Sequence, residues 1–392
     1  MKNVYIVEGA RTPFGSFGGV LKDVDPTELG VFASKEAIRR SGIDASDIDL
    51  SVIGNVIHSS KNAPYLARHV ALKSGVPMES PALAVNRLCG SGLQSVVSAT
   101  QSILLGEGNV ALAGGVDSMS LAPYALRGSR FGTKLGIPQM DDMLWAALTD
   151  EYIGSGMGVT AENLADKYDI SRAEQDEYAT LSHQRAAEAR NEGKFAEEIA
   201  PVEVKSRKGT TVIDTDEHIK EETTSEKLAK LKPAFKKDGS VTGGNASGIN
   251  DGAGAVILAK EEYVQDHSLS PLAKIVSWGV AGVDPSYMGI GPVPAIKKAL
   301  NNSSLTIDDI DLIEVNEAFA AQYLAVEKEL GLSRDKVNVN GGAIALGHPV
   351  GASGTRVLYS VIKELKRRNQ KYGIASLCIG GGQGIAMIVE VV

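Results

Sequence analysis

The sequence predicts an α/β protein made of two similar halves with an inserted segment between them. Near both ends of the 392-residue chain, short apolar stretches that end in glycine alternate with stretches of helical periodicity. DIDL occurs at 47–50 and again at 309–312, and Ser91-Gly92 and Ser353-Gly354 repeat with the same spacing. Residues 120–249 are more polar and lack this rhythm. A duplicated βα unit with mixed, largely parallel sheets is therefore expected.

Composition and charge disfavour several classes of function. A net charge of −8 argues against general binding to nucleic acid or to anionic membranes. No apolar run reaches the roughly 20 residues of a transmembrane helix, and no signal or transit peptide is expected ahead of the first strand. The two cysteines are far apart and the six histidines show no paired spacing, so no disulfide framework or metal site is expected. We expect a cytoplasmic enzyme that uses no metal.

The first half reads as four strands and three helices. Apolar stretches predict strands at 4–8, 48–56, 81–85 and 110–115. Helical spacing of apolar residues predicts helices at 27–41 and 65–74, and Gly75 and Pro77 form a stop signal for the second of them. The third helix begins within the segment VNRLCGSGLQSVVSAT at 85–100, because apolar residues recur at helical spacing after its glycines.

Cys89 lies in that segment, between a strand and the start of a helix. Unpaired N–H groups and the positive end of the helix dipole lower the pKa of a thiol in such a place. Gly90 and Gly92 let a ligand approach the backbone closely. A buried cysteine that serves as a small hydrophobe is commoner, but the glycines and the helix start favour a nucleophile.

The inserted segment predicts two helices, at 161–167 and 172–192, and a charge-dense stretch at 205–237. That stretch has an excess of basic residues and ends in KPAFKKDG. A surface for a polyanionic ligand is one interpretation of it. From charge alone, a solvated loop is favoured.

The second half repeats the strand–helix alternation. Strands are expected at 252–260 and in a second stretch that begins with residues 277–280. Helices are expected at 291–302 and from Ala352 onward. His348 lies in the glycine-built stretch NVNGGAIALGHPVGASGT, directly before the last of these helices. This place corresponds to that of Cys89 in the first half. A pseudo-two-fold relation between the halves would bring both turns to one crevice, so His348 is predicted to be catalytic.

Two further clusters have more than one interpretation. Cys378 stands between two apolar strands within 372–390 and precedes three consecutive glycines, Gly380 first. This pattern suits a hairpin with a buried thiol, or a proton-transfer group beside an oxyanion site. Asn316-Glu317 follows a strand and precedes a helix, where it suits an N-cap or a residue that holds a catalytic water equally well.

In these residues the chain resembles the thiolase family over essentially its whole length. The motifs are ARTPFGSF, NRLCGSGLQSV, GGNASGINDGAGAVIL, VNEAFAAQ, NGGAIALGHPVGASG and CIGGGQG, in the family's order. The resemblance implies two βαβαβαββ core domains at 1–119 and 250–392, layered α/β/α/β/α, and a coenzyme A-binding loop domain at 120–249. It also implies a tetrameric or dimeric enzyme. The expected form is a homotetramer, a dimer of dimers, in which the exposed loop 127–138 joins the dimers.

The resemblance implies a role for each catalytic residue. Cys89 takes the acyl group, His348 activates Cys89 and helps to bind the thioester oxygen, and Cys378 transfers the α-proton. Asn316 holds a water that completes one oxyanion hole with His348. The backbone N–H groups of Cys89 and Gly380 form the other hole.

The resemblance also implies which residues meet the acyl-CoA. Ser247 lies near the pantetheine; Met157, Met288 and Phe319 line the acyl pocket; Leu148 and Phe235 flank the coenzyme; Lys220 and His183 lie near its nucleotide end. Coenzyme A thioesters are substrates here, so no cofactor is expected. Biosynthetic members often carry a histidine just before the Met-Gly pair, where this chain has Gly156. That difference bears on the pantetheine tunnel and on chain length, not on the catalytic set.

Two thiols, an imidazole and glycine-rich backbone suit a Claisen condensation between thioesters. The motif wording is closest to acetyl-CoA acetyltransferases. The expected reaction therefore joins two acetyl-CoA into acetoacetyl-CoA and CoA, reversibly and by a ping-pong mechanism. The alternative is a degradative 3-ketoacyl-CoA thiolase that acts on longer chains. A non-catalytic acyl-CoA- or lipid-binding protein would lack part of the Cys/His/Cys set, which is complete here.

Overall fold

The computed structural model describes residues 3–133, 135–137, 139–207 and 209–392. Lys134 and Pro138, which belong to the loop predicted at 127–138, lie outside the described residues. So does Lys208 of the charge-dense stretch.

A ten-stranded sheet runs through the described residues in the order β14-β15-β16-β13-β1-β12-β5-β3-β4, with β2 paired to β12. Its strands are β1 (Val4–Arg11), β2 (Gly15–Ser16), β3 (Leu50–Gly54), β4 (Ala82–Val85), β5 (Val110–Ser118), β12 (Asn250–Lys260), β13 (Ala273–Gly282), β14 (Leu312–Val315), β15 (Tyr372–Ile379) and β16 (Gln383–Val391). The register between β1 and β13 covers only two residue pairs, so the sheet divides there into an N-terminal and a C-terminal half.

The prediction of a largely parallel sheet is wrong. Parallel pairing is confined to β3–β4, β3–β5 and β14–β15, near the outer edges of the two halves. The central strands pair antiparallel. For β15 and β16 the reason is the short glycine turn that joins them, because only antiparallel strands can be connected by so few residues.

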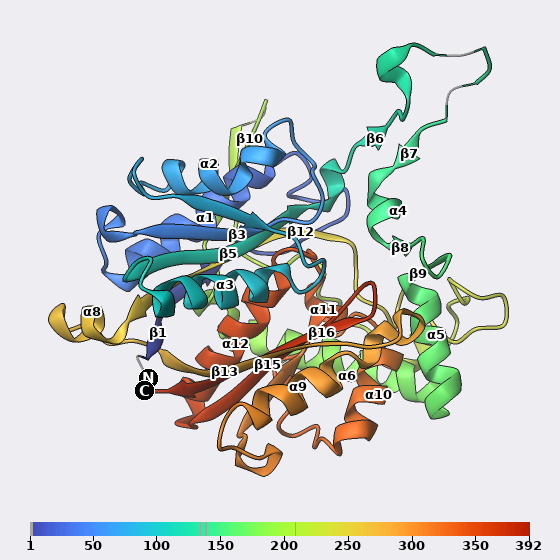
Figure 1. Ribbon diagram of the computed structural model, residues 1–392. Coiled ribbons are helices and arrows are strands. Elements are labelled where there is room, and N and C mark those ends of the chain that lie inside the picture. The colour runs from blue at the N-terminus through green and yellow to red at the C-terminus, as the bar shows by residue number, and fades with distance from the viewer. Residues whose placement is uncertain (1–2, 134, 138, 208) are drawn as a thin grey trace.

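Helices cover both outer faces and fill the space between the two half-sheets (Figure 1). Helices α1 (Pro26–Ser41) and α2 (Leu66–Lys73) pack on the outside of the N-terminal half. Helices α3 (Ser91–Leu105) and α12 (Ser353–Arg368) lie between the halves, and α9 (Pro292–Asn301) and α10 (Ala320–Leu330) cover the C-terminal half. Each interface holds its own buried apolar core, so the predicted α/β/α/β/α layering is confirmed.

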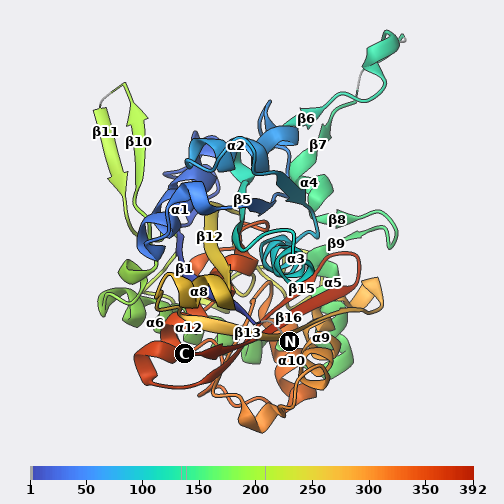
Figure 2. The same ribbon diagram turned by 60° about the vertical axis from the view of Figure 1, so that its left-hand side comes forward.

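Among the described residues, the inserted segment adds no strand to this sheet. It contains the strand pairs β6 (Tyr124–Ala125) with β7 (Asp141–Asp142), β8 (Thr149–Asp150) with β9 (Ser155–Gly156), and β10 (Val202–Ser206) with β11 (Gly209–Ile213). Its helices are α4 (Met143–Ala147), α5 (Met157–Tyr168), α6 (Arg172–Asn191) and α7 (Ser225–Leu228). The arm that begins at β6 and β7 and the β10–β11 hairpin both extend away from the layers (Figure 2). The domain limits 119/120 and 249/250 stay a prediction.

Most predicted elements exist, with shifted ends. The strand predicted at 48–56 is shorter, and the helix predicted at 161–167 starts earlier, at Met157. The stretch 205–237 is not simply a loop, because it contains β11, the end of β10, and α7. The remaining helices are α8 (Glu261–Asp266) and α11 (Ala343–Leu346). No helix in the described part of the chain is both long and apolar enough to span a bilayer.

The two halves meet at the first turns of α3 and α12. A Cβ atom on Gly92 would lie 2.8 Å from the carbonyl oxygen of Gly351, and one on Gly354 would lie 2.3 Å from the backbone nitrogen of Leu93. Only glycine permits this approach of backbone to backbone. The contact brings the turns that precede both helices, and thus Cys89 and His348, to one place.

Candidate active site

Cys89 is partly exposed in a tight turn before α3. Leu88 adopts a positive φ of 47°, and Ser91 Oγ holds the turn by accepting from Arg87 N (2.8 Å) and donating to Leu88 O (2.7 Å). The backbone N–H groups of Gly380 and of Cys89 itself both point at the Cys89 sulfur. Two donors are therefore available to the carbonyl oxygen of an acyl group attached to this sulfur.

Burial raises the pKa of the Cys89 thiol to about 11, and the charge of nearby Asp117 adds to the rise. The two backbone N–H groups oppose this shift but do not cancel it. The prediction of a lowered pKa is therefore wrong, because loss of hydration outweighs the helix start. At neutral pH the sulfur is a thiol and needs a base.

His348 is placed to be that base. Its backbone N–H donates to Asn250 Oδ1 (2.9 Å), and its Nδ1 lies 2.5 Å from Ser353 Oγ. Ser353 Oγ donates to Pro349 O (2.9 Å), so it accepts from Nδ1–H, which leaves Nε2 without a proton. Burial, with a smaller effect of the Arg356 charge, lowers the His348 pKa to about 3. The imidazole is thus neutral at pH 7.

Asn316 faces the basic nitrogen of His348. Its Nδ2 lies 3.4 Å from His348 Nε2, and its Oδ1 is buried without a hydrogen-bond partner in the protein. A buried amide oxygen of this kind is satisfied by a ligand or a water. The N-cap interpretation of 316–317 is wrong, because the N-cap of α10 is Phe319 and no side chain caps that helix.

Glu317 instead supports the backbone around the site. Its carboxylate accepts from Tyr178 OH (2.7 Å), Ser182 Oγ (2.7 Å) and Ile344 N (3.1 Å). Tyr178 and Ser182 come from α6 of the inserted segment, so this buried carboxylate ties that segment to the strand end that carries Asn316.

Cys378 is buried near the end of β15, opposite Gly384 of β16. Burial raises its thiol pKa well above the ordinary value, and the neighbouring Cys89 raises it further. Since the charge of Cys89 acts on Cys378, the two sulfurs lie near each other. Gly380 follows in the turn, where a Cβ atom would lie 3.2 Å from a Leu88 side-chain carbon and 3.3 Å from Met157 Sδ.

A mostly apolar cavity of about 200 Å³ opens beside Cys89 and His348. All six residues predicted for the acyl pocket and the pantetheine line it, namely Leu148, Met157, Phe235, Ser247, Met288 and Phe319. The rings of Phe235 and Phe319 meet edge to face at 6.0 Å. The structure therefore brings these predicted residues together around the two reactive side chains.

The two residues predicted at the nucleotide end line a second cavity of about 570 Å³. Lys220 is joined there by other lysines, and the Lys220 backbone N–H donates to His183 Nδ1 (3.2 Å). Burial, with the charges of His218 and Lys220, lowers the His183 pKa to about 4, so this ring is neutral. Gly243 lines both cavities, which makes them neighbours along one path toward Cys89.

Sequence reasoning missed several site residues. Ser353 was noticed only as part of the repeat, yet it sets the tautomer of His348. Asp117, at the end of an apolar strand, accepts from Ile57 N (2.9 Å) and Gly351 N (2.7 Å), and burial raises its pKa to about 7. A charged residue that ends a buried strand was the available signal for it. Gly243 begins the motif GGNASGINDGAGAVIL, but nothing in that motif marked it as the residue shared by two cavities.

Comparison with known proteins identifies the family. Residues 4–262 match the thiolase N-terminal domain, and residues 269–391 match the thiolase C-terminal domain. This chain belongs to the thiolase family. Thiolases are acyltransferases that bind CoA and acyl-CoA substrates, and the fold agrees with solved thiolase structures. Within the described residues of this thiolase, no group of three or more His, Cys, Asp or Glu side chains is arranged to hold a metal ion.

Named relatives fall into two groups. The mitochondrial 3-ketoacyl-CoA thiolase of Homo sapiens is 54% identical over 391 residues, which cover 100% of this thiolase and 98% of the relative. Its crystal structure superposes with a TM-score of 0.97 and covers 100% and 99% of the two chains. The acetyl-CoA acetyltransferase of Bacillus anthracis has a TM-score of 0.98 at 48% identity, with the same coverage. That of Syntrophomonas wolfei is 49% identical over 394 residues and covers 99% of each chain.

Proposed function

We propose that this thiolase cleaves 3-ketoacyl-CoA thioesters, including chains longer than acetoacetyl-CoA, with free CoA as the second substrate. The space at Gly156 carries the proposal. A Cβ atom there would meet nothing closer than Leu148 O at 3.5 Å and Thr149 Oγ1 at 3.9 Å. Glycine thus leaves open a part of the cavity wall that a larger side chain would fill. Met157 and Met288 line the same cavity with flexible thioether chains that adapt to ligands of different length.

In the first half-reaction, His348 Nε2 accepts the proton of the Cys89 thiol. The thiolate attacks the C3 carbonyl carbon of the 3-ketoacyl-CoA, and the C2–C3 bond breaks. The shortened acyl group stays on Cys89 as a thioester. The departing acetyl-CoA enolate takes a proton from the Cys378 thiol at its α-carbon. The role of His348 as the base is supported by its neutral imidazole and by the absence of a proton on Nε2.

In the second half-reaction, the Cys378 thiolate takes the thiol proton of CoA. The CoA sulfur attacks the acyl carbon on Cys89, and the released Cys89 thiolate recovers its proton from His348. Both thiols and the imidazole return to their resting states, so the cycle is closed. Acetyl-CoA and an acyl-CoA shortened by two carbons are the products.

Negative charge develops on two carbonyl oxygens during these steps. The backbone N–H groups of Cys89 and Gly380 are proposed to stabilise one of them, and this is supported by their common direction toward the Cys89 sulfur. His348 and a water on Asn316 are proposed to stabilise the other, supported by the unpartnered Asn316 Oδ1. One well-placed donor of this kind contributes on the order of 3 kcal/mol.

The coenzyme is proposed to lie with its thiol end in the smaller cavity and its nucleotide in the larger one. Ser247 and Leu148 line the first, and Lys220, Lys227 and Lys232 line the second. Lysine ammonium groups suit the phosphates of the nucleotide. The shared Gly243 is the point at which the pantetheine would pass between the cavities.

An acetyl-CoA acetyltransferase that forms acetoacetyl-CoA is the second candidate. Its support is the close structural match to the Bacillus anthracis enzyme and the similar identity to the Syntrophomonas wolfei enzyme. The same residues serve this reaction, which is the reverse of thiolysis with the shortest chain. Only chain-length preference separates the two candidates.

The deciding experiment measures thiolysis of acetoacetyl-CoA and of a 3-ketoacyl-CoA of about eight carbons, with Cys89→Ala as the control. We expect the longer substrate to be cleaved at least as fast as acetoacetyl-CoA, and neither to be cleaved by the variant. In Gly156→His, the rate of cleavage of the longer substrate relative to that of acetoacetyl-CoA should fall about tenfold, since small changes in pocket volume discriminate between substrates on this scale. A wild-type preference for acetoacetyl-CoA would support the acetyltransferase instead.

We also propose that the protein is a cytoplasmic homotetramer. The arm beyond β6 and β7 carries Phe131, Leu135 and Ile137 almost fully exposed. Exposed apolar side chains gathered on one projecting segment are typical of an interface, so the arms are proposed to join two dimers. Light scattering of the wild type and of Phe131→Asp should give a tetramer and a smaller species, respectively.

A further inference from the structure

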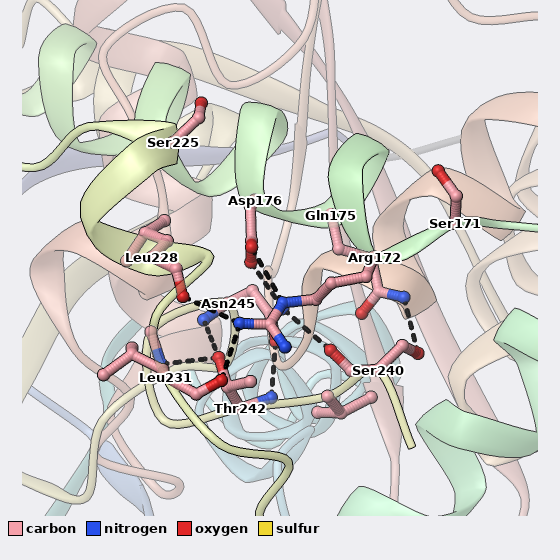
Figure 3. A network of polar contacts seen from close by, with 12 residues as sticks. Ser171, Arg172, Gln175, Asp176, Ser225, Leu228, Leu231, Ser240, Thr242 and Asn245 are labelled. Carbon is pink, nitrogen blue, oxygen red and sulfur yellow. Dashed lines mark hydrogen bonds and ion pairs between the residues drawn. The ribbon is translucent and has the colours of Figure 1, made fainter. Parts of the chain in front are cut away.

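A network of polar groups begins at Arg172, the first residue of α6 (Figure 3). The Arg172 guanidinium donates through Nε to Asp176 Oδ2 (2.7 Å), one turn along the helix. Its Nη2 donates to Leu228 O (2.7 Å) and Leu231 O (2.9 Å). The side chain of Asp176 is only 3% exposed. One arginine therefore fixes the segment 228–231 to α6.

The same aspartate holds a second segment. Asp176 Oδ1 accepts from Asn245 Nδ2 (2.9 Å). Asn245 Oδ1 in turn accepts from Thr242 N (2.8 Å), and Thr242 Oγ1 accepts from Gly244 N (3.1 Å). These bonds close the turn 242–245. Asp176 thus bonds this turn directly through Asn245 and the 228–231 segment through Arg172.

Both segments form the walls of the proposed coenzyme path. Leu228 and Leu231 line the larger cavity, and Gly243 lines both cavities. The walls are in contact, because a Cβ atom on Gly244 would lie 2.5 Å from Leu231 Cδ1 and 2.6 Å from Leu228 Cδ2. A Cβ atom on Gly243 would meet nothing within 4 Å, so that residue faces open space.

We propose that Arg172 and Asp176 are positioning residues that set the geometry of the coenzyme path and thereby the affinity for the nucleotide-bearing substrate. Neither residue lines either cavity, so neither would touch the substrate. Arginine suits this role because its planar fork holds a carboxylate and two carbonyl oxygens in a fixed arrangement. The inference rests on the proposed use of CoA thioesters and adds the residues that control coenzyme binding.

The test compares two thiol substrates in thiolysis of saturating acetoacetyl-CoA. CoA carries the nucleotide and pantetheine lacks it, so only CoA reaches the wall formed by 228–231. In Arg172→Ala we expect the KM for CoA to rise about tenfold, which corresponds to about 1.4 kcal/mol. In the same variant, the KM for pantetheine and the kcat should each differ from the wild-type value by less than about twofold.

In Arg172→Lys the KM for CoA should lie between those of the wild type and Arg172→Ala, because an ammonium group keeps the charge but cannot bond the carboxylate and both carbonyls together. This variant decides the matter if Arg172→Ala does not fold. The rise in KM for CoA should be smaller than in Arg172→Ala and again absent for pantetheine. A general loss of structure would not separate the two thiols in this way.

Arg40→Ala is the matched control. Arg40 also bonds an acid one turn away on its helix, Glu36 (2.7 Å), and donates to the carbonyls of Glu197 (2.6 Å) and Ile199 (2.9 Å). Those carbonyls belong to residues that line neither cavity. We expect a lower melting temperature in this variant and an unchanged ratio of the two KM values.

Equal changes for CoA and pantetheine, or an unchanged KM for CoA in folded Arg172→Ala and Arg172→Lys, would overturn the positioning role. Absence of thiolysis in the wild type would instead refute the proposed function. The two failures are therefore distinguishable.

Discussion

The two halves of the core each contain an aspartate between a short 3-10 turn and a parallel strand. Asp49 Oδ2 accepts from two successive backbone N–H groups at the start of β5, at 2.7 and 3.1 Å. Asp311 Oδ2 accepts from two at the start of β15, both at 2.9 Å. The two residues belong to the repeated DIDL motif. In both halves the motif performs the same task, which is to align the beginning of the neighbouring parallel strand.

The repeated serine has a different task in each half. Ser91 Oγ bonds only backbone groups of the Cys89 turn, at Arg87 and Leu88. Ser353 Oγ donates to a backbone carbonyl in the same manner but accepts from the His348 ring. The two halves therefore share the serine hydrogen bonds that support the backbone. They differ in the side chain beside the serine, because only Ser353 also bonds a histidine ring.

Cys378→Ser should have the largest effect and tests whether the two thiols have different roles. We expect Cys89 to be acylated by acetyl-CoA still, because His348 generates its thiolate and CoA can leave as a thiolate without a proton from Cys378. Carbon–carbon bond formation needs a base at the α-carbon and should fall by about 10³-fold, within the usual range of general acid–base contributions. Intact mass reports the acyl-enzyme, and the condensation assay reports the second step. Normal condensation in this variant would contradict the role of Cys378.

Alkylation of the two thiols tests their different environments. The Cys89 pKa of about 11 lies above neutral pH, so its thiolate fraction and its reaction with iodoacetamide should rise about tenfold per pH unit from pH 7 to 9. Buried Cys378, whose pKa is also raised, should react far more slowly. Peptide mass analysis distinguishes the sites. A rate independent of pH over this range would mean that Cys89 is already ionised.

Ser353→Ala and Ser91→Ala test whether equivalent serines have diverged. Without Ser353 Oγ the His348 ring loses the acceptor that fixes its tautomer, so kcat should fall about tenfold, as for other outer partners of an active histidine. Ser91→Ala should act mainly on stability, by about 1 kcal/mol, because its bonds are to backbone. Steady-state rates and urea unfolding of both variants provide the measurement. Equal losses of kcat would contradict the divergence.

Asp49→Ala and Asp311→Ala should have the smallest and the most similar effects. Each removes the acceptor of two backbone N–H groups at the start of β5 or of β15 and should lower the free energy of unfolding by about 1–2 kcal/mol, with kcat unchanged. Urea unfolding measures the first quantity. A large loss of activity in only one of the pair would show that the motif is not equivalent in the two halves.

Much of the site could be predicted because its signals are local. Cys89 and His348 stand in glycine-rich turns before helices, and Cys378 lies at a strand end before three glycines. The six lining residues were assigned by position from the family resemblance. Residues such as Asp117 and Gly243 escaped prediction because their importance lies in what surrounds them. Nothing in their neighbouring sequence indicates a backbone N–H at 2.7 Å or a junction between two cavities.

The sequence alone determined the α/β class, the order of most elements, the duplication and the choice of candidate catalytic side chains, because periodicity, glycine turns and motifs act over a few residues. Tertiary structure decided the antiparallel centre of the sheet, the raised pKa of Cys89 and the hydrogen bonds of Arg172 to the 228–231 segment. Each of these depends on groups far apart in the chain. Strand pairing and desolvation are set by the completed packing around a residue, and no local pattern contains that information.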